Sequence, residues 1–148
     1  MSIQQQVTDK MKEAMKSKNT VALTALRALK SAFMLAQTEA GAGDLSEEQE
    51  LKIVQKQVKQ RKDSAKVFQE QDREDLAEPE LAEAAVLEQF LPEALSDEEI
   101  TEVVEQTIEK TGASGMKDMG KVMGIVSKQL AGKADGKTIS AIVKEKLS

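Results

Sequence analysis

The sequence contains no cysteine, histidine, tyrosine or tryptophan, and its only aromatic residues are three phenylalanines. Without cysteine there can be no disulfide, thiolate nucleophile or zinc-finger site. Without histidine, the Ser-His-Asp and Cys-His triads, the Glu-x-x-His di-iron motif and the H-E-x-x-H zinc motif are excluded. Three phenylalanines are too few for the aromatic platform on which RNA-recognition sheets stack bases. Catalysis by this chain alone would rest on carboxylates, lysine, arginine, serine or threonine, and we expect neither a metal ion nor a cofactor.

Proline and long hydrophobic runs are also scarce. The chain has two prolines, and its longest strictly apolar run, from Ala32 to Ala36, is far too short to span a membrane. The N-terminal residues lack the basic and apolar regions of a secretory signal, so we expect a cytoplasmic protein that does not bind membranes. Charged residues make up 32% of the 148 residues and aromatic residues only 2%, which favours an all-helical fold.

The net charge of −5 conceals a segregation of charge along the chain. Residues 1–37 carry six basic and two acidic side chains, residues 38–111 carry eight basic and 21 acidic, and residues 112–148 carry seven basic and three acidic. Two basic ends therefore flank an acidic middle, so the mean charge is a poor guide to binding partners. The same pattern also fits charged helices that only keep the protein in solution.

Apolar residues recur at helical spacing along nearly the whole chain. The pattern predicts an all-α, multihelical fold, with an N-terminal four-helix array in residues 1–92 followed by a C-terminal three-helix bundle in residues 96–148. The first part ends at Leu91-Pro92, because proline disfavours helical backbone at the residue before it.

Several residues mark where the predicted helices begin and end. Ser96 and Glu99 form a capping box, which is the clearest helix start in the sequence. Pro79 is well placed as the first residue of the fourth helix. The sixth helix is expected to run from about Met116 to Ala131.

The sixth predicted helix has an apolar face and a basic face. At about 100° per residue, three lysines fall within about 40° of one another, and two glycines lie beside them. These residues are Lys117, Lys121, Lys128, Gly120 and Gly124. Glycine inside a helix costs about 1 kcal/mol relative to alanine, so two of them indicate close approach to the backbone. A phosphodiester backbone would suit this face; another helix packed on the glycines, with the lysines in water, is the alternative.

Residues 132–138, with the sequence Gly-Lys-Ala-Asp-Gly-Lys-Thr, superficially resemble a phosphate-binding loop. The nucleotide motif requires four residues between its glycines where this segment has three, and the segment joins two predicted helices. Lys133 and Lys137 could extend the basic face at a helix N-terminus, where amide groups favour anions. An ordinary turn with Asp135 as the N-cap explains the same residues.

Three cationic residues of the N-terminal part are further candidates. Arg61 falls on the apolar face of the third predicted helix. It either faces a ligand or pairs with a carboxylate between helices, because an unpaired buried charge is costly. The possible partners are Glu70, Asp72, Glu74, Asp75, Glu80 and Glu83. Arg27 and Lys30 lie one turn apart on the second predicted helix and could add to a basic surface.

Two acidic clusters could suggest a cation site. They comprise Glu47, Glu48 and Glu50 in one segment and Asp97, Glu98 and Glu99 in another. Both open predicted helices, where carboxylates stabilise the helix dipole, and neither has the spacing of an EF-hand loop. We therefore interpret both clusters as helix capping.

Five segments resemble the signature stretches of the YqeY-like proteins, in the same order and over the whole chain. They are Leu26–Ala32, Lys59–Ala65, Gln89–Pro92, Gly112–Gly124 and Gly132–Lys137. The most specific stretch is Asp118-Met119-Gly120-Lys121-Val122-Met123. At Lys133 the family more often has arginine; lysine keeps the cation but weakens the case for a bidentate phosphate contact.

The resemblance implies an all-helical protein related to the C-terminal tail of GatB, the tRNA-binding subunit of glutamine-dependent Asp/Glu-tRNA amidotransferase. It implies a module that contacts the tRNA body, and the same module is appended to some glutaminyl-tRNA synthetases. Free-standing members carry a label of carbon–nitrogen ligase activity with glutamine as amide donor. The residues do not support that activity for this chain, because they supply no glutaminase nucleophile, ATP-binding loop or catalytic domain.

We therefore expect a tRNA-binding accessory module that contacts the RNA backbone. Phosphate contacts would come from Lys117, Lys121 and Lys128, with access provided by Gly120 and Gly124. The second-rank candidates are Lys133, Lys137, Arg27 and Lys30. One alternative is a non-catalytic helical adaptor that binds an aminoacyl-tRNA synthetase or amidotransferase subunit through the same face. A third hypothesis is an enzyme.

Overall fold

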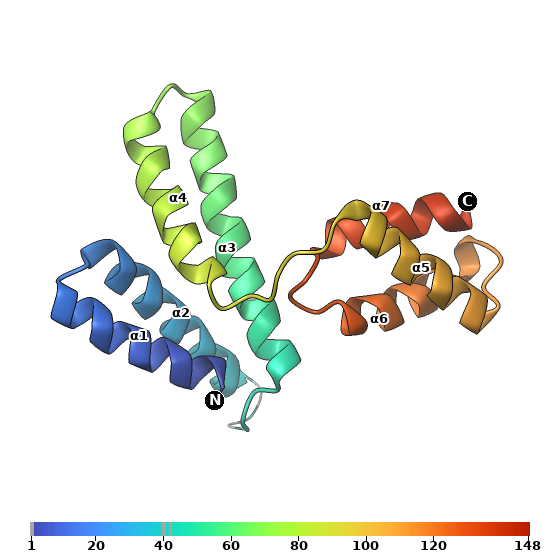
Figure 1. Cartoon of the computed structure of the whole chain (residues 1–148), viewed down its shortest axis with the longest axis horizontal. Coiled ribbons are helices and arrows are strands. Elements are labelled where there is room, and N and C mark those ends of the chain that lie inside the picture. Colours follow the sequence, from blue (N-terminus) through green and yellow to red (C-terminus); the bar gives the residue numbers. More distant parts are fainter. Residues whose placement is uncertain (1, 40, 42) are drawn as a thin grey trace. The chain divides into compact units, whose positions relative to one another are not determined.

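The computed structural model describes residues 2–39, 41 and 43–148, and these residues form helices and connecting turns without a strand (Figure 1). The helices are α1 (Ile3–Ser17), α2 (Thr20–Glu39), α3 (Glu47–Glu70), α4 (Glu74–Glu88), α5 (Asp97–Thr111), η1 (Met116–Asp118, a 3-10 turn), α6 (Met119–Gln129) and α7 (Gly136–Leu147). The predicted all-α fold is confirmed. None of the described helices is both long and apolar enough to cross a bilayer.

The chain divides into two compact units, which we describe separately: unit 1 is Met1–Leu91 and unit 2 is Pro92–Ser148. In unit 1, α1 pairs with α2 and α3 pairs with α4, while α2 also contacts α3 and α4. The core consists of apolar residues at three- and four-residue spacing along these helices. On α2 it includes Leu26, Leu29 and Phe33, each at most 1% exposed. Helix α2 is therefore the central helix of unit 1.

Local capping signals determine where α1 and α3 begin. Ser2 and Ser46 each accept a hydrogen bond from the backbone N–H three residues later, and the glutamines at those positions bond back to the serine N–H. These two capping boxes each satisfy two backbone donors that a helix start leaves without partners. Helix α1 ends at Lys18, which has a φ of 57° in the left-handed region.

Glu50 contributes to packing in a way that differs from our prediction of simple capping. It is only 3% exposed, and its Oε2 accepts a hydrogen bond from the backbone N–H of Gln4 at 3.1 Å. Gln4 lies in the first turn of α1, which has no acidic residue of its own. Glu50 therefore places a negative charge at the N-terminus of a neighbouring helix and fastens α1 to α3.

The prediction that Pro79 begins the fourth helix is wrong. Helix α4 begins at Glu74, and Pro79 lies inside it. The carbonyl of Arg73 accepts bonds from the N–H groups of Leu76 and Ala77, so the first turn is complete before the proline. Two acidic residues in that turn stabilise the helix N-terminus, while proline, which cannot donate a bond, leaves only the carbonyl of the exposed Asp75 without its usual partner.

In unit 2, helices α5, α6 and α7 pack against one another. Their core comprises Ile100, Val104, Val122, Val126, Leu130, Ile139, Ile142, Val143 and Leu147. The capping box predicted at the start of α5 is confirmed, because Ser96 accepts from the N–H of Glu99 and Glu99 accepts from the N–H of Ser96. The backbone N–H of Leu95 also bonds to the carbonyl of Lys133 at 2.9 Å. This bond fixes the loop between α6 and α7.

Candidate nucleic-acid interface

The segment before α6 differs from the continuous helix that we predicted. Lys117 lies in η1, and α6 runs from Met119 to Gln129 instead of from Met116 to Ala131. The carboxylate of Asp118 accepts a bond from the backbone N–H of Ser114 at 3.1 Å. Such a local side-chain bond competes with helical bonding and favours a tight turn at a helix start. Lys117 therefore precedes α6 and is not part of it.

Helix α6 separates its apolar and basic residues as the spacing predicts. Val122 and Val126 are fully buried against α5 and α7, while Lys121 and Lys128 are exposed. Gly120, Gly124 and Lys117 are exposed as well. We call Lys117, Gly120, Lys121, Gly124 and Lys128 the α6 surface. These residues stand away from the core of unit 2, so a partner can reach them.

The two glycines of the α6 surface have open space beside them. At Gly120 and at Gly124, an added Cβ would meet no described atom within 4 Å beyond its immediate helical surroundings. Of the two explanations for these glycines, packing by another helix of the described chain is therefore wrong. A helix that carries glycine without an intramolecular reason gives up helix stability, which is expected where something else approaches the backbone.

The lysines of the α6 surface have no acidic partner among the residues described. Residues 119–134 contain no aspartate or glutamate. Nearby, Asp118 accepts from the N–H of Ser114, and Asp135 accepts from the N–H of Thr138 at 2.6 Å. Both carboxylates thus serve local backbone bonds, and no described residue forms an ion pair with the three lysines. The positive charge of the α6 surface is therefore uncompensated at short range.

The loop after α6 contains the other two candidates of unit 2. Lys133 and Lys137 are both exposed. The predicted N-cap is confirmed, since the carboxylate of Asp135 caps α7. Because a carboxylate already occupies this helix N-terminus, the amide groups there are poorly placed to attract an anion. Any contribution of Lys133 and Lys137 to anion binding comes from their side chains.

Not every cation of the region is available. Lys146 on α7 forms an ion pair with Glu105 on α5 at 3.0 Å, and this hydrogen-bonded carboxylate raises the pKa of Lys146. Arg27 and Lys30 are exposed on α2. They belong to unit 1, so the fold does not join them to the α6 surface within one compact unit.

Arg61 lies in unit 1 between α3 and α4. Its Nη1 donates to the carbonyl oxygen of Gln57 at 3.1 Å and to Oε1 of the same residue at 2.7 Å, while its buried Nε has no partner among the described residues. Glu83 is the predicted acidic partner that Arg61 affects. Burial raises the pKa of the Glu83 carboxyl, and the positive charge of Arg61 partly opposes this rise. This geometry favours a structural role for Arg61.

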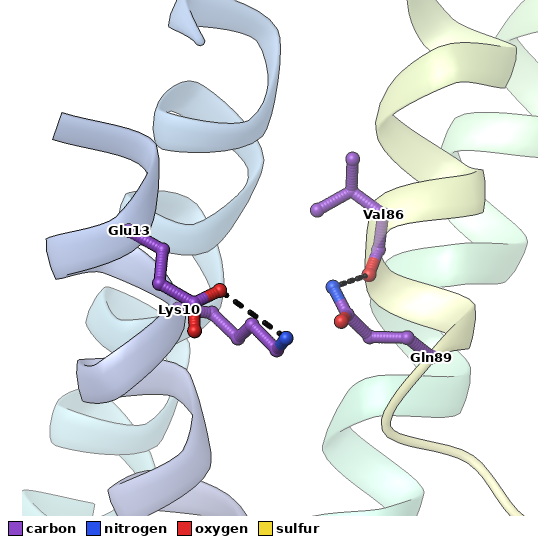
Figure 2. A network of polar contacts seen from close by, with 4 residues as sticks. All are labelled: Lys10, Glu13, Val86 and Gln89. Carbon is purple, nitrogen blue, oxygen red and sulfur yellow. Dashed lines mark hydrogen bonds and ion pairs between the residues drawn. The ribbon is translucent and has the colours of Figure 1, made fainter. Parts of the chain in front are cut away.

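A shallow pocket of about 260 Å³ lies in unit 1, and it does not contain the predicted candidates. Figure 2 shows Lys10 and Glu13 of α1 on one side and Val86 and Gln89 of α4 on the other. Lys10 pairs with Glu13 at 3.3 Å, and the amide of Gln89 donates to the carbonyl of Val86 at 2.7 Å (Figure 2). These bonds stay within one helix on each side and form no pairing of a nucleophile with a base.

Exposed apolar residues beside the lysines were missed in the sequence. Ile125 on α6 is 41% exposed and Met116 in η1 is 44% exposed. Helical spacing places Ile125 next to Lys121, about 40° around the helix, so the wheel contained the signal. Among the described residues, no group of three or more acidic, histidine or cysteine side chains is placed to hold a metal ion.

Comparisons with known proteins give the following matches. A family model described as Yqey-like protein matches residues 4–147. Over 123 residues, the chain is 36% identical to "Altered inheritance of mitochondria protein 41, mitochondrial" of Clavispora lusitaniae, which covers 81% of this chain and 69% of that protein. The protein of the same name in Pyrenophora tritici-repentis is 32% identical over 139 residues, covering 91% of this chain and 75% of the relative.

A second kind of relative is part of a tRNA-dependent enzyme. The chain is 42% identical over 84 residues to a glutamyl-tRNA(Gln) amidotransferase subunit of Thermococcus gammatolerans. This match covers 54% of the present chain but only 13% of the amidotransferase subunit. The similarity therefore concerns a small part of that subunit.

Proposed function

Because the chain belongs to the YqeY-like family, as its motifs predicted and the match over residues 4–147 shows, we propose that it is a non-catalytic accessory module that binds tRNA through the α6 surface. One observation carries the proposal: exposed lysines without acidic partners lie beside glycines that leave the helix backbone open. The similarity to part of a glutamyl-tRNA(Gln) amidotransferase subunit supports tRNA as the RNA.

The chemistry of the α6 surface suits the phosphate backbone of RNA. Each lysine presents a compact charge on a flexible stem, which neutralises a phosphate without requiring a fixed geometry. Glycine lets the phosphodiester chain come near the helix axis, which a longer side chain would prevent. Backbone contacts position a protein on a nucleic acid and carry little sequence information. The proposed module therefore recognises tRNA chiefly by charge and shape.

We propose no ligase activity for the chain by itself. The sequence supplies neither cysteine nor histidine, and the pocket of unit 1 lacks a nucleophile held by a base. In this proposal the amide-transfer chemistry belongs to a larger partner, an amidotransferase or an aminoacyl-tRNA synthetase. The chain would contribute RNA binding to that partner. Ammonia transfer to misacylated tRNA by the purified chain would contradict this assignment.

The proposal is tested by reversing one charge on the α6 surface. Lys121→Glu should weaken tRNA binding at least tenfold at low salt, because one attraction to a phosphate becomes a repulsion. Lys12→Glu makes the same change at an exposed position of α1 and serves as the matched control. Fluorescence anisotropy with labelled tRNA measures both affinities, and circular dichroism checks the fold. Equal affinities of the two variants would refute a role for Lys121.

A second function is favoured by the exposed apolar side chains beside the glycines. Ile125 and Met116 could pack against a helix of a synthetase or amidotransferase subunit, with the glycines allowing close approach. This adaptor would need no RNA for its interaction. A complex that survives nuclease treatment and is lost on Ile125→Glu would support it. A complex that nuclease dissolves would support the tRNA-binding function instead.

We further propose that the chain acts in the cytoplasm. The relatives from Clavispora and Pyrenophora carry the word mitochondrial in their names, so location needs a direct measurement. Cell fractionation followed by detection of the untagged protein provides it. Recovery of the protein in a membrane-bounded organelle would overturn this part of the proposal.

A further inference from the structure

Unit 2 carries cations but lacks the residues that most often read base identity. Residues 92–148 contain no arginine, so all of the exposed cations here are lysines. All three phenylalanines lie in unit 1, where Phe33 and Phe90 are buried and Phe68 is half-buried. Bidentate arginine contacts to guanine and stacking of splayed bases on aromatic rings are therefore unavailable to the α6 surface. A surface of this composition fits a paired stem better than an unpaired loop.

The glycines leave hydrogen-bond acceptors of the helix backbone uncovered. A helical side chain covers the turn that precedes its own Cα. Gly124 therefore exposes the turn around the Gly120 carbonyl, and Gly120 exposes the turn around the Met116 carbonyl, with no described side chain above either position. A carbonyl bonded once within a helix retains a second lone pair. The α6 surface thus offers backbone acceptors with lysines on either side.

We propose that the α6 surface docks across the minor groove of a double-stranded RNA stem and distinguishes RNA from DNA through ribose 2′-hydroxyl groups. This inference rests on the proposed function. The minor groove of A-form RNA is wide and shallow and displays 2′-hydroxyls, which can donate to the uncovered carbonyls. The minor groove of B-DNA is only about 6 Å wide and lacks these hydroxyls. The lysines contact phosphates along the groove edge, and the exposed side chain of Ile125 contacts ribose carbons.

The test compares three probes with the full-length protein: an RNA hairpin with a long stem, a DNA hairpin of the same sequence, and a single-stranded RNA of the same length. Anisotropy at one fixed salt concentration should show RNA-hairpin binding about tenfold tighter than binding of either other probe, because one or two hydrogen bonds and the groove fit are lost. Gly124→Leu covers the exposed backbone and leaves every lysine in place. It should bring the ratio of RNA to DNA affinity close to one.

Ala141→Leu, at an exposed position of α7, is the matched control and should leave that ratio unchanged. Thermal melting by circular dichroism confirms that both variants fold. Equal binding of the RNA and DNA hairpins by the unmodified protein, or an unchanged ratio in Gly124→Leu, would overturn the 2′-hydroxyl inference while tRNA binding stands. Preference for the single-stranded RNA would overturn the stem. Absence of binding to both tRNA and the RNA hairpin would overturn the proposed function itself.

Discussion

Glu50 gives the sharpest test of how unit 1 is held together. Its carboxylate is 3% exposed and accepts the N–H of Gln4 at 3.1 Å, so it serves a helix from which it is distant in sequence. A hydrogen bond to a charged group contributes about 1.5–3 kcal/mol net, and a charge at a helix N-terminus contributes about 0.3–1 kcal/mol. Glu50→Gln keeps the shape and an acceptor oxygen, so we expect a loss of about 1–2 kcal/mol. Glu50→Ala leaves the Gln4 N–H unpaired, and we expect a loss of about 2–3 kcal/mol.

Urea denaturation followed by circular dichroism measures both losses, and hydrogen exchange locates them. The first turn of α1 should lose protection in Glu50→Gln, while α4 should keep it. Glu48→Gln is the matched control on the same helix; Glu48 pairs only with Lys52, one turn away at the surface, and its loss should cost less than about 0.5 kcal/mol. If Glu48→Gln and Glu50→Gln destabilise the protein equally, Glu50 does not hold α1 as described.

Three further predictions concern single residues. Burial raises the pKa of Glu83 above its ordinary value although Arg61 opposes the rise, so the folded state binds this proton more tightly and stability falls as pH rises from the ordinary to the raised pKa; Glu83→Gln should flatten that fall in pH-dependent melting and be no less stable at neutral pH. Gly112 ends α5 with a φ of 67°, so Gly112→Ala should cost about 1 kcal/mol, whereas Lys18→Gly, at a φ of 57°, should stabilise by a few tenths to about 1 kcal/mol in chemical denaturation. Gly124→Ala adds a methyl group in open space and should raise stability by about 0.5–1 kcal/mol; a lower melting temperature would show that this position is occupied.

Signals within one turn of helix were the most reliable part of the sequence. Ser96 and Glu99 are three residues apart and satisfy each other's backbone groups, so their capping box forms whatever surrounds it. The burial of Val122 and Val126 and the exposure of Lys121 likewise follow from helical spacing. These features could be read without knowledge of the packing.

Features that depend on competing bonds or distant partners were not predictable in this way. Pro79 looked like a helix start, but Arg73 and the acidic residues after it begin α4 earlier. Lys117 matched the helical wheel, yet the bond from Ser114 to Asp118 places it in a 3-10 turn. Glu50 looked like a cap of its own helix, and only the packing of α1 shows which amide it binds.

The central claim is that the lysines of the α6 surface contact RNA phosphates, and the salt dependence of tRNA binding tests it most directly. The comparison is between the unmodified chain and the triple variant Lys117→Ala, Lys121→Ala and Lys128→Ala. Each phosphate contact contributes about 0.7–0.9 to the slope of log affinity against log salt concentration. We predict that the triple variant binds more weakly, with a slope shallower by about two units. The same slope and affinity in both proteins would contradict the claim.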